Sequence, residues 1–288
     1  MIDTTQVVVD GAFTMRRLLL AAVICGAAQG AYAADMPDLP VLRGSYSEGL
    51  STVRTVWQGY YIGGQAGVGE SDMNFTGATR DIVARLLSGT EMEQQQNISS
   101  WPVLGKGSSR GDGWGGFVGY NSQWDDVVIG VEANYMHGSF GGSQTGSMTR
   151  FFTLPSGYTD SVTNQASASM SISDIGTLRA RAGYAVGCFL PYMFGGLALG
   201  QANIVKTARV FGTQNNPNVA PPFDVVPFDD SATDVRRSRL LVGYSAGLGV
   251  DVNLIAGLFL RAEWEYMRLA TPIDTSINTV RAGVGYRF

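Results

Sequence analysis

INTVRAGVGYRF, residues 277–288, separates into two chemically different sets when every second residue is taken. The mainly apolar set consists of Asn278, Val280, Ala282, Val284, Tyr286 and Phe288. The other set consists of Ile277, Thr279, Arg281, Gly283, Gly285 and Arg287. A period of two is the period of a β-strand. These twelve residues therefore predict a strand with one apolar face, and the question is whether that face meets water, a core or lipid.

The same alternation recurs toward the N-terminus between stretches rich in turn residues. It is clear at 257–268, where Leu258, Leu260 and Trp264 interleave with Arg261 and Glu263. The segment at 190–203 is ambiguous, because its leucines share a side with a glycine. Eight strands are predicted, at 57–69, 113–124, 127–138, 174–186, 190–203, 238–251, 257–268 and 277–288.

Composition narrows the class of protein. Charged residues make up 15% of the chain, below the quarter that is typical of soluble domains, and 38 of 288 residues are glycine. The formal net charge of −4 gives no electrostatic reason to expect nucleic acid as a partner. Apolar residues amount to 45%, enough for a sizeable buried surface.

Alternation alone does not say which face of the strands points outward, because a soluble barrel with an apolar interior would show the same period. The residues of the polar face decide it. Glycines beside a few mixed arginines and glutamates suit a cramped lumen better than a solvated surface. The apolar face is therefore expected to point outward, into lipid, where strands satisfy their backbone groups only in a closed barrel. The sequence predicts an all-β, eight-stranded antiparallel up-and-down transmembrane β-barrel.

The N-terminal region has the pattern of an export signal. From Met15 it carries the basic pair Arg16 and Arg17, an apolar core and the small-residue site Ala31-Tyr32-Ala33. We expect residues 1–33 to be a signal peptide, with 1–14 reflecting a start codon assigned too early, and 34–56 to be a periplasmic tether. Residues 57–288 then form the barrel domain, in which Cys188 is the sole cysteine, excluding an intramolecular disulfide or a Cys-based zinc site.

The gaps between strands differ in length. Long gaps at 70–112, 139–173 and 204–237 alternate with tight turns near 125, 187–189 and 252–256. Outer-membrane barrels have long external loops and short periplasmic turns, so both termini are expected in the periplasm. Two aromatic girdles are predicted, one of Trp57, Tyr60, Trp124, Tyr184, Tyr192, Tyr286 and Phe288, and one of Trp114, Tyr135, Trp264 and Tyr266.

The segments WQGYYIGGQAGVG, GWGGFVGYNSQW, VIGVEANY, GTLRARAGYAVGCFLPYMFGGLALG, GYSAGLGVDV and NTVRAGVGYRF together resemble the strands of a known family. It is the small outer-membrane β-barrel family of Gram-negative bacteria, comprising OmpA-like and opacity-protein-like surface antigens, often termed the porin family. The resemblance spans 57–288. It implies that Phe288, with Tyr286 and Val284, is recognised by the barrel-assembly machinery. Outer-membrane lipid and lipopolysaccharide are the expected partners of the apolar exterior. An adhesin or ligand-binding role for the loops, with an external ligand or a host surface as the partner, stays open.

Two departures from the family pattern stand out. The first loop is long and contains ARLLSGTEMEQQQ, which predicts a short helix. No appended peptidoglycan-binding domain is recognisable, so anchoring to the cell wall is not expected by analogy.

Charged residues on the inward faces predict a lumen network of Glu132, Arg179, Arg181, Arg261, Glu263, Glu265 and Arg281, with Arg287 beside it. Glu132 is expected to face Arg179 and Arg181, and the two glutamates of 257–268 to face Arg281. Such pairing needs only opposite charges on neighbouring strands, so a structural role is favoured over catalysis. Neither a phosphate-binding glycine motif nor a metal-binding cluster is recognisable, and no cofactor is expected.

One enzymatic hypothesis rests on His137-Gly138-Ser139, which resembles the dyad of outer-membrane lipid A deacylases. The nearest carboxylate in register, Glu132, lies on the opposite pleat, so we interpret this triplet as a strand end that enters a glycine-rich loop. The predicted function is structural support and surface presentation in the envelope, without catalytic residues. Two alternatives stay open: a narrow small-solute channel, decided by conductance, and a lipid A hydrolase, decided by mutating His137.

Overall fold

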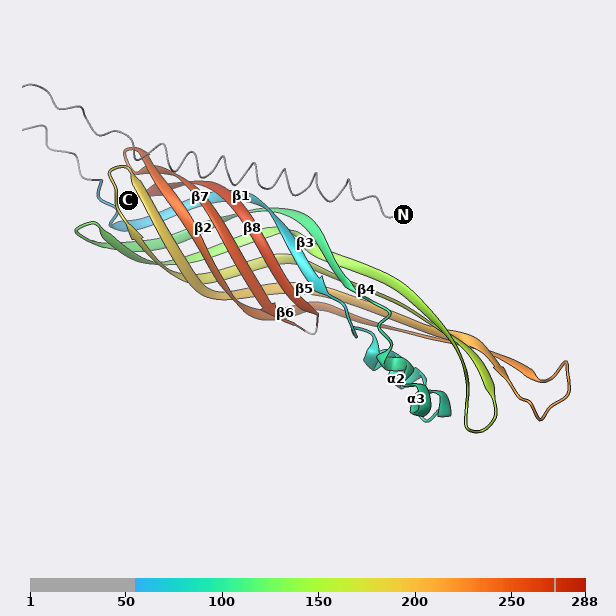
Figure 1. The fold of residues 1–288 in the computed structure, drawn as a ribbon. Helices are drawn as coiled ribbons and strands as arrows, with labels where there is room; N and C mark the ends of the chain where they lie inside the picture. Colours follow the sequence, from blue (N-terminus) through green and yellow to red (C-terminus); the bar gives the residue numbers. More distant parts are fainter. Residues whose placement is uncertain (1–54, 272) are drawn as a thin grey trace, which may run out of the picture. The chain divides into compact units, whose positions relative to one another are not determined.

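The computed structural model describes residues 55–271 and 273–288, and these residues belong to one compact unit. The expected signal peptide and nearly all of the expected tether lie outside the described residues. Eight strands follow one another around a closed antiparallel barrel, and β1 pairs with β8 to close it (Figure 1). The predicted fold class and strand order are confirmed.

The strands carry the bounds β1 Gly59–Asn74, β2 Lys106–Trp124, β3 Val127–Thr153, β4 Thr159–Tyr184, β5 Phe189–Asn215, β6 Val225–Ile255, β7 Leu258–Ala270 and β8 Asp274–Arg287. Tight turns join β2 to β3, β4 to β5 and β6 to β7 at one end of the barrel, as predicted, and Phe288 lies at the same end. We call it the turn end.

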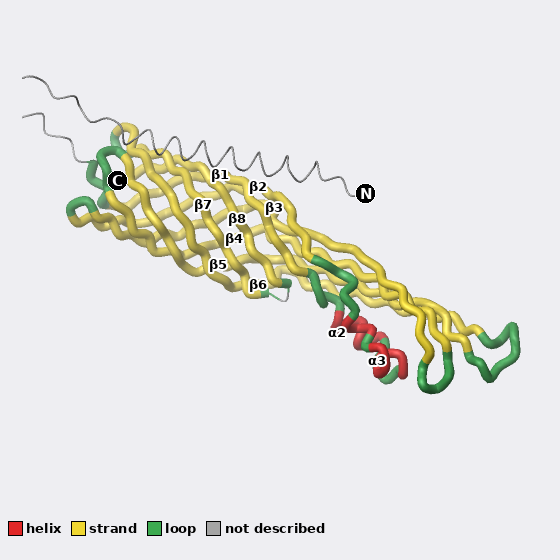
Figure 2. The backbone as a smooth tube through the Cα atoms, in the orientation of Figure 1, coloured by secondary structure: helices red, strands yellow, loops and turns green. Residues whose placement is uncertain are grey.

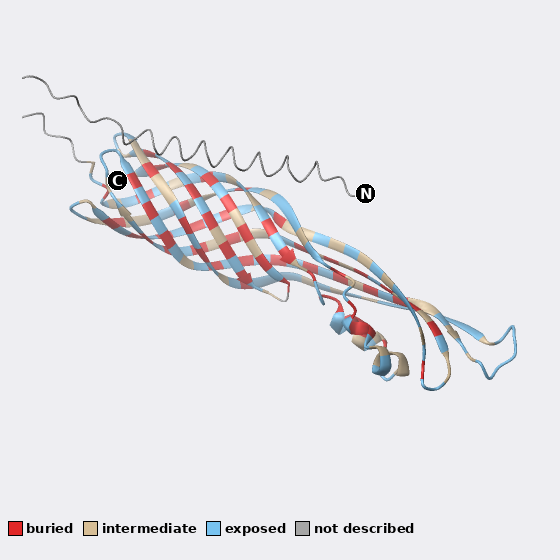
Figure 3. Cartoon of the chain, in the orientation of Figure 1, coloured by how far each residue is buried: buried red, intermediate tan, exposed pale blue. Residues whose placement is uncertain are grey.

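Burial alternates along each barrel strand with a period of two (Figure 3). Val280 and Val284 are 59% and 47% exposed, whereas Arg281 between them is 3% exposed. The apolar residues of β3, β6 and β7 are likewise on the outside. The apolar face therefore points outward and the charged and glycine face points inward, as the alternation predicted.

Inward glycines make room for aromatic rings in the lumen. A Cβ atom added to Gly63 would lie 2.2 Å from Phe117 Cζ, and one added to Gly249 would lie 2.5 Å from Tyr192 Cζ. These distances are shorter than van der Waals contact permits, so any larger residue would displace a ring. The high glycine content of the inward face is thus a condition for filling the barrel with large side chains.

The predicted loops at 139–173 and 204–237 are wrong, because most of their residues are strand. β3, β4, β5 and β6 continue past the rim as a four-stranded sheet, drawn as long strands in Figure 2. We call residues 139–173 and 203–239 the extension. Its β3 and β4 parts are rich in serine, threonine, alanine and glycine, and its β5 and β6 parts mix apolar and charged residues on both faces. The contrast between the two faces is therefore weak and resembles that of a loop.

A line of irregularities marks the rim. The strand pairings shift register at His137/Phe140, Ile172/Asp174 and Ala202/Ile204. These shifts lie side by side on adjacent strands. Since a β-bulge bends and twists a strand, a row of them allows the extension to leave the curvature of the barrel.

The β1–β2 connection packs on the extension. It contains α2 (Arg80–Leu86), α3 (Glu91–Gln96) and the 3₁₀ turn η1 (Ile98–Ser100), so the predicted helix in this loop is confirmed. Ile82, Val83 and Ile98 are fully buried in a cluster with Val162 and Val210 of the extension. None of the helices in the described part of the chain is long and apolar enough to cross a membrane.

The lumen is filled in three layers. An aromatic cluster lies near the turn end and includes Trp57, Tyr61 and Phe117. A charged layer lies at mid-barrel, and an apolar cluster that includes Phe75, Phe140 and Ile277 fills the rim. The charged layer is unusual because it gathers buried arginines and carboxylates in the barrel interior.

Candidate functional site

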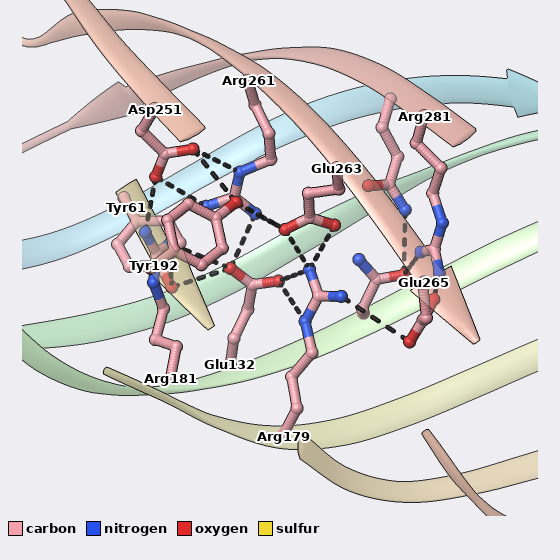
Figure 4. Close-up of polar contacts among 12 residues, drawn as sticks. Tyr61, Glu132, Arg179, Arg181, Tyr192, Asp251, Arg261, Glu263, Glu265 and Arg281 are labelled. Carbon is pink, nitrogen blue, oxygen red and sulfur yellow. Dashed lines mark hydrogen bonds and ion pairs between the residues drawn. The ribbon is translucent and has the colours of Figure 1, made fainter. Parts of the chain in front are cut away.

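Eight ionisable groups meet in the middle of the barrel, and each is at most 3% exposed (Figure 4). Four are arginines and four are carboxylates, so their formal charges cancel. They are Arg179, Arg181, Arg261, Arg281, Glu132, Asp251, Glu263 and Glu265. β3, β4, β6, β7 and β8 supply them, each from its inward pleat.

The strand register creates two of the ion pairs directly. Glu132 of β3 lies opposite Arg179 of β4, and the Arg179 Nε donates to Glu132 at 2.9 Å. Asp251 of β6 lies opposite Arg261 of β7, whose Nε donates to the carboxylate at 2.8 Å. Opposite charges at facing positions of adjacent strands stabilise the pairing of those strands.

Other contacts cross the lumen between strands that are not neighbours. Arg179 donates to Glu263 at 2.8 Å, and Arg261 donates to Glu132 at 2.7 Å. Arg181 donates to Asp251 at 2.7 Å. These bonds tie β3 and β4 to β6 and β7 across the interior, as the dashed lines in Figure 4 show.

Two tyrosines complete the layer. The Tyr61 hydroxyl donates to Glu132 at 2.8 Å, and the Tyr192 hydroxyl donates to Glu263 at 2.6 Å. The arginines also stack on rings, with the Arg181 guanidinium 3.7 Å from the centre of Tyr192 and that of Arg261 3.9 Å from the centre of Phe117. Aromatic faces and hydrogen bonds together replace the water that these cations would otherwise bind.

The side of the layer nearest the rim is built around Arg281. Its guanidinium contacts Glu265 and donates to Asn134 at 3.2 Å. The Asn134 side chain also accepts a hydrogen bond from Gln65 at 2.8 Å. Polar groups of β1 and β3 thus hold this cation in place alongside its acidic partner.

The structure brings together all seven charged residues that the sequence placed in the lumen, and the expected contacts of Glu132 with Arg179 and Arg181 and of Glu265 with Arg281 are present. The expected contact between Glu263 and Arg281 is wrong. Glu263 lies opposite Arg281 in the strand register but bonds to Arg179, because the side chains lean across the lumen. Arg287 lies apart from the layer and stacks 5.0 Å from Trp57.

Sequence reasoning missed Asp251, Tyr61 and Tyr192. The alternation of β6 could have found Asp251, since it shares its parity with the inward residues Ser245 and Gly247. The expected aromatic girdle was wrong for Trp57 and Tyr192, which are 1% and 5% exposed and face the lumen. Tyr192 lies on the inward pleat of β5, the segment whose alternation was ambiguous.

The structure also corrects the expectation about His137. A carboxylate does lie beside it, because Asp174 of β4 pairs with His137 in the register and its Oδ1 is 2.9 Å from His137 Nδ1. Tyr135 donates to the same oxygen at 2.6 Å, and Ser173 donates to the other at 2.6 Å. This cluster lies on the outer surface at the rim, separate from the lumen, and His137 is half exposed.

The extension holds further ionisable groups. Arg209 donates to Asp229 at 2.7 Å, and this hydrogen bond holds the pKa of the Asp229 carboxyl below its usual range. Asp160 is buried and its Oδ1 has no hydrogen-bond partner among the described residues. Burial raises the pKa of Asp160.

Chemically, the charged layer is a closed set of mutual partners. Every carboxylate in it contacts an arginine, and the layer lies between the aromatic and apolar clusters. Among the described residues, no group of three or more His, Cys, Asp or Glu side chains is arranged to hold a metal ion. The arrangement is suited to joining strands and filling the interior.

Comparison with known proteins adds a family and relatives. The model of the outer membrane protein beta-barrel domain matches residues 18–288. A 25 kDa outer-membrane immunogenic protein of Brucella ovis is 27% identical over 184 residues, which cover 63% of this chain and 67% of the relative. The protein of the same description from Brucella abortus is 25% identical over 194 residues, covering 63% and 69%.

Solved structures were also matched at low similarity. The attachment invasion locus protein Ail of Yersinia pestis is 14% identical with a TM-score of 0.34, and the match covers 80% of this chain and 99% of Ail. Neisserial surface protein A is 10% identical with a TM-score of 0.35, covering 80% and 97%.

Proposed function

Because the chain belongs to the outer membrane protein beta-barrel domain family, we propose that it is a structural barrel of the outer membrane with a closed lumen. Its role is to present the extension and the packed β1–β2 loop at the cell surface. The barrel supplies the anchor, and the sheet that rises from β3 to β6 supplies the presented surface.

The observation that carries this proposal is the filling of the lumen. The interior of an eight-stranded barrel is just wide enough for side chains. Here the eight charges, two tyrosines and the clusters on either side occupy it. Charges desolvated in this way are held by their partners, and separating them to admit an ion or solute is costly. This interior therefore supports a structural role for the barrel better than a role as a channel.

The exposed aromatic residues and the short turns support an orientation of the barrel in the membrane. Tyr60, Trp124, Tyr184, Tyr286 and Phe288 are exposed near the turn end, and Trp114 and Tyr135 are exposed toward the rim. Trp264, expected in the second girdle, is exposed at mid-barrel. Aromatic residues of this kind favour the two membrane interfaces. Short turns face the periplasm in outer-membrane barrels, so we assign the turn end and both termini to the periplasm and the extension to the outside.

The apolar exterior supports lipid as the immediate partner, with lipopolysaccharide meeting the rim on the outer side. Phe288 is 77% exposed on the outer face and its backbone N–H donates to the Tyr60 carbonyl at 2.9 Å. The terminal aromatic thus projects from the seam between β8 and β1. An outward row of Val284, Tyr286 and Phe288 is the surface that we assign to recognition by the assembly machinery.

Conductance in planar bilayers tests the closed lumen. Folded wild-type protein, recognised by heat-modifiable gel mobility, is expected to give little stable current. Large and steady single-channel currents from the same preparation would contradict a closed barrel and favour the narrow small-solute channel. A denatured sample, which lacks the mobility shift, serves as the control for leakage caused by misfolded protein.

A second candidate function follows from the outer rim. The bond between Asp174 and His137 orients the imidazole as a hydrolase would need, although no hydrogen bond joins His137 to Ser139 among the described residues. Release of acyl chains from lipid A by the wild type, lost in His137→Ala and in Asp174→Asn, would establish this activity. Equal lipid A profiles with and without the protein would exclude it.

A further inference from the structure

The extension ends in an open strand edge. In the extension, β6 pairs with β5 from Val225, which lies opposite Asn215, to Arg239, which lies opposite Ala202. The pairing of β6 with β7 begins only at Val242. Residues 225–239 therefore have no strand partner on their second side within the described chain. Val225, Val226 and Val235 on this edge are 45%, 56% and 49% exposed. Unpaired edges of this length are templates for another strand.

The charges on this edge are sorted by sign. Asp229 and Asp230 lie toward the tip, and Arg236 and Arg237 lie toward the rim. A strand that faced an identical strand in parallel would set each charge against its own sign. The reverse direction sets acids against bases, so the pattern selects an antiparallel arrangement of two copies.

One register satisfies both pairs at once. With Thr233 opposite Thr233, Asp229 faces Arg237 and Asp230 faces Arg236, because positions equidistant from the centre meet. The faces agree as well. Phe228 and Ala232 pack toward the β1–β2 loop, so even positions from 228 to 236 face the loop and odd positions up to 237, just before the register shift, face away from it. Each proposed pair joins residues of one parity, hence of one face.

Two of the four charged residues in these proposed pairs have no ion-pair partner within the described chain. Within the described residues, neither Asp230 nor Arg237 has an ion-pair partner, whereas Asp229 bonds to Arg209 and Arg236 to Asp234. In the antiparallel arrangement each unpaired group meets a group that is already held in position. Arg237 would join an existing pair at Asp229, and Asp230 would meet an ordered guanidinium.

We propose that the β6 edge binds the β6 edge of a second copy of this chain in antiparallel register. The extension continues the run of the barrel strands away from the turn end (Figure 1). Two antiparallel edges therefore place the two barrels at opposite ends of the joined sheet, in opposing membranes. The paired segment from Pro227 to Arg239 would hold the two rims about 40 Å apart, at about 3.3 Å per residue.

This inference rests on the proposed presentation of the extension at the cell surface. Charges on an edge strand usually discourage pairing. Here the sorted signs discourage pairing between neighbours in one membrane, where edges run parallel, and permit pairing between membranes. The partner of the presented surface is thus the same surface on another cell or vesicle.

The test uses the full chain reconstituted in vesicles of two colours. Wild-type vesicles are expected to tether into mixed-colour clusters. The variant Asp229→Arg/Asp230→Arg carries a basic residue at all four paired positions, and the variant Arg236→Asp/Arg237→Asp carries an acidic residue at all four. Each is expected to lose tethering to itself by about tenfold or more, because like charges would face each other in every pair.

Mixing the two variants restores opposite charges at all four pairs, so mixed vesicles are expected to tether at least as well as the wild type. This rescue also shows that both variants are folded. Asp72→Arg/Asp274→Arg, which makes the same change in charge at exposed rim positions of β1 and β8, is the matched control and should tether normally. Mixed variants that tether no better than either alone would overturn the proposed pairing.

A separate measurement distinguishes failure of the pairing from failure of the proposed orientation. Asn218→Cys in a Cys188→Ser background places a thiol at the exposed β5–β6 tip. Labelling of intact cells by a membrane-impermeant maleimide is expected. Labelling without tethering refutes only the pairing, and absence of labelling refutes the outward orientation as well.

Discussion

Arg179 joins opposite sides of the lumen. Its guanidinium contacts Glu132 on the neighbouring strand and Glu263 across the interior, and it lies 4.1 Å from the centre of the Phe194 ring. A buried ion pair adds little net stability when both partners form, yet removing one partner leaves an uncompensated charge. Each charged residue of the layer is therefore needed for stability, because without it its partners would be left as buried, unpaired charges.

Arg281 offers a clean test of this dependence. Arg281→Ala is expected to lower the free energy of unfolding by about 3–5 kcal/mol, because Glu265 loses its contact in a desolvated site. Adding Glu265→Gln should recover part of the loss. Adding Glu263→Gln instead should not, since that carboxylate is bonded to Arg179. Thermal unfolding in detergent measures all three, and equal recovery by both second changes would contradict the observed pairing.

Asp160 predicts a dependence on pH. Its folded pKa is raised by burial, so the group lowers stability only where the unfolded chain would ionise, above about pH 4, and the cost disappears below that. Asp160→Asn should therefore protect the β3–β4 hairpin at pH 7, slowing amide exchange about fivefold, as expected for about 1 kcal/mol. No difference is expected near pH 3. Equal protection at both pH values would point to a cause other than ionisation.

At the scale of elements, the barrel strands and the extension differ in how far the sequence predicts them. β7 and β8 could be predicted because large apolar residues alternate with charges and glycine. The extension strands were taken for loops because Ser, Ala and Gly in β3 and β4, and mixed apolar and charged residues in β5 and β6, give the two faces nearly the same character. Partners across the lumen depend on how strands are staggered around the barrel, which no single segment encodes. Asp251 was predictable in position, but its bond to Arg181 was not.

The packing of α2 on the extension predicts a separable element. Ile82→Ala removes a fully buried side chain and should weaken the docking of the β1–β2 loop by about 2–5 kcal/mol. Proteolysis within residues 75–105 should then become much faster, while heat-modifiable mobility of the barrel stays unchanged. Arg85→Ala, at an exposed position of the same helix, is the control and should leave cleavage unaltered.

At the scale of the whole molecule, the barrel closes where its last strand meets its first. β1 and β8 pair from Tyr61–Arg287 to Asn74–Asp274, so assembly is complete only when the C-terminal strand is in place. The outward side of that strand remains exposed to lipid, while its inward side supplies Arg281 to the charged layer. One strand thus carries both the seam and part of the interior.

Phe288→Ser is expected to reduce the amount of assembled barrel in the outer membrane severalfold, because it removes the terminal aromatic of the outward row. Arg287→Ser should have a smaller effect, since Arg287 faces inward and stacks on Trp57. Heat-modifiable mobility in isolated outer membranes, normalised to total protein, compares them. Equal yields of the two variants would remove the reason for assigning recognition to Phe288.

The row of bulges at the rim has a consequence for how this surface can diversify. Beyond it, residues 154–158 join β3 to β4 and residues 216–224 join β5 to β6, and these strands no longer follow the stagger of the barrel. Adding two residues to each strand of a hairpin preserves which side chains face inward, whereas adding one reverses them. Length variants of the extension should therefore differ by multiples of four residues per hairpin. The distance that the hairpins reach from the membrane would change in fixed steps, while the barrel stays the same.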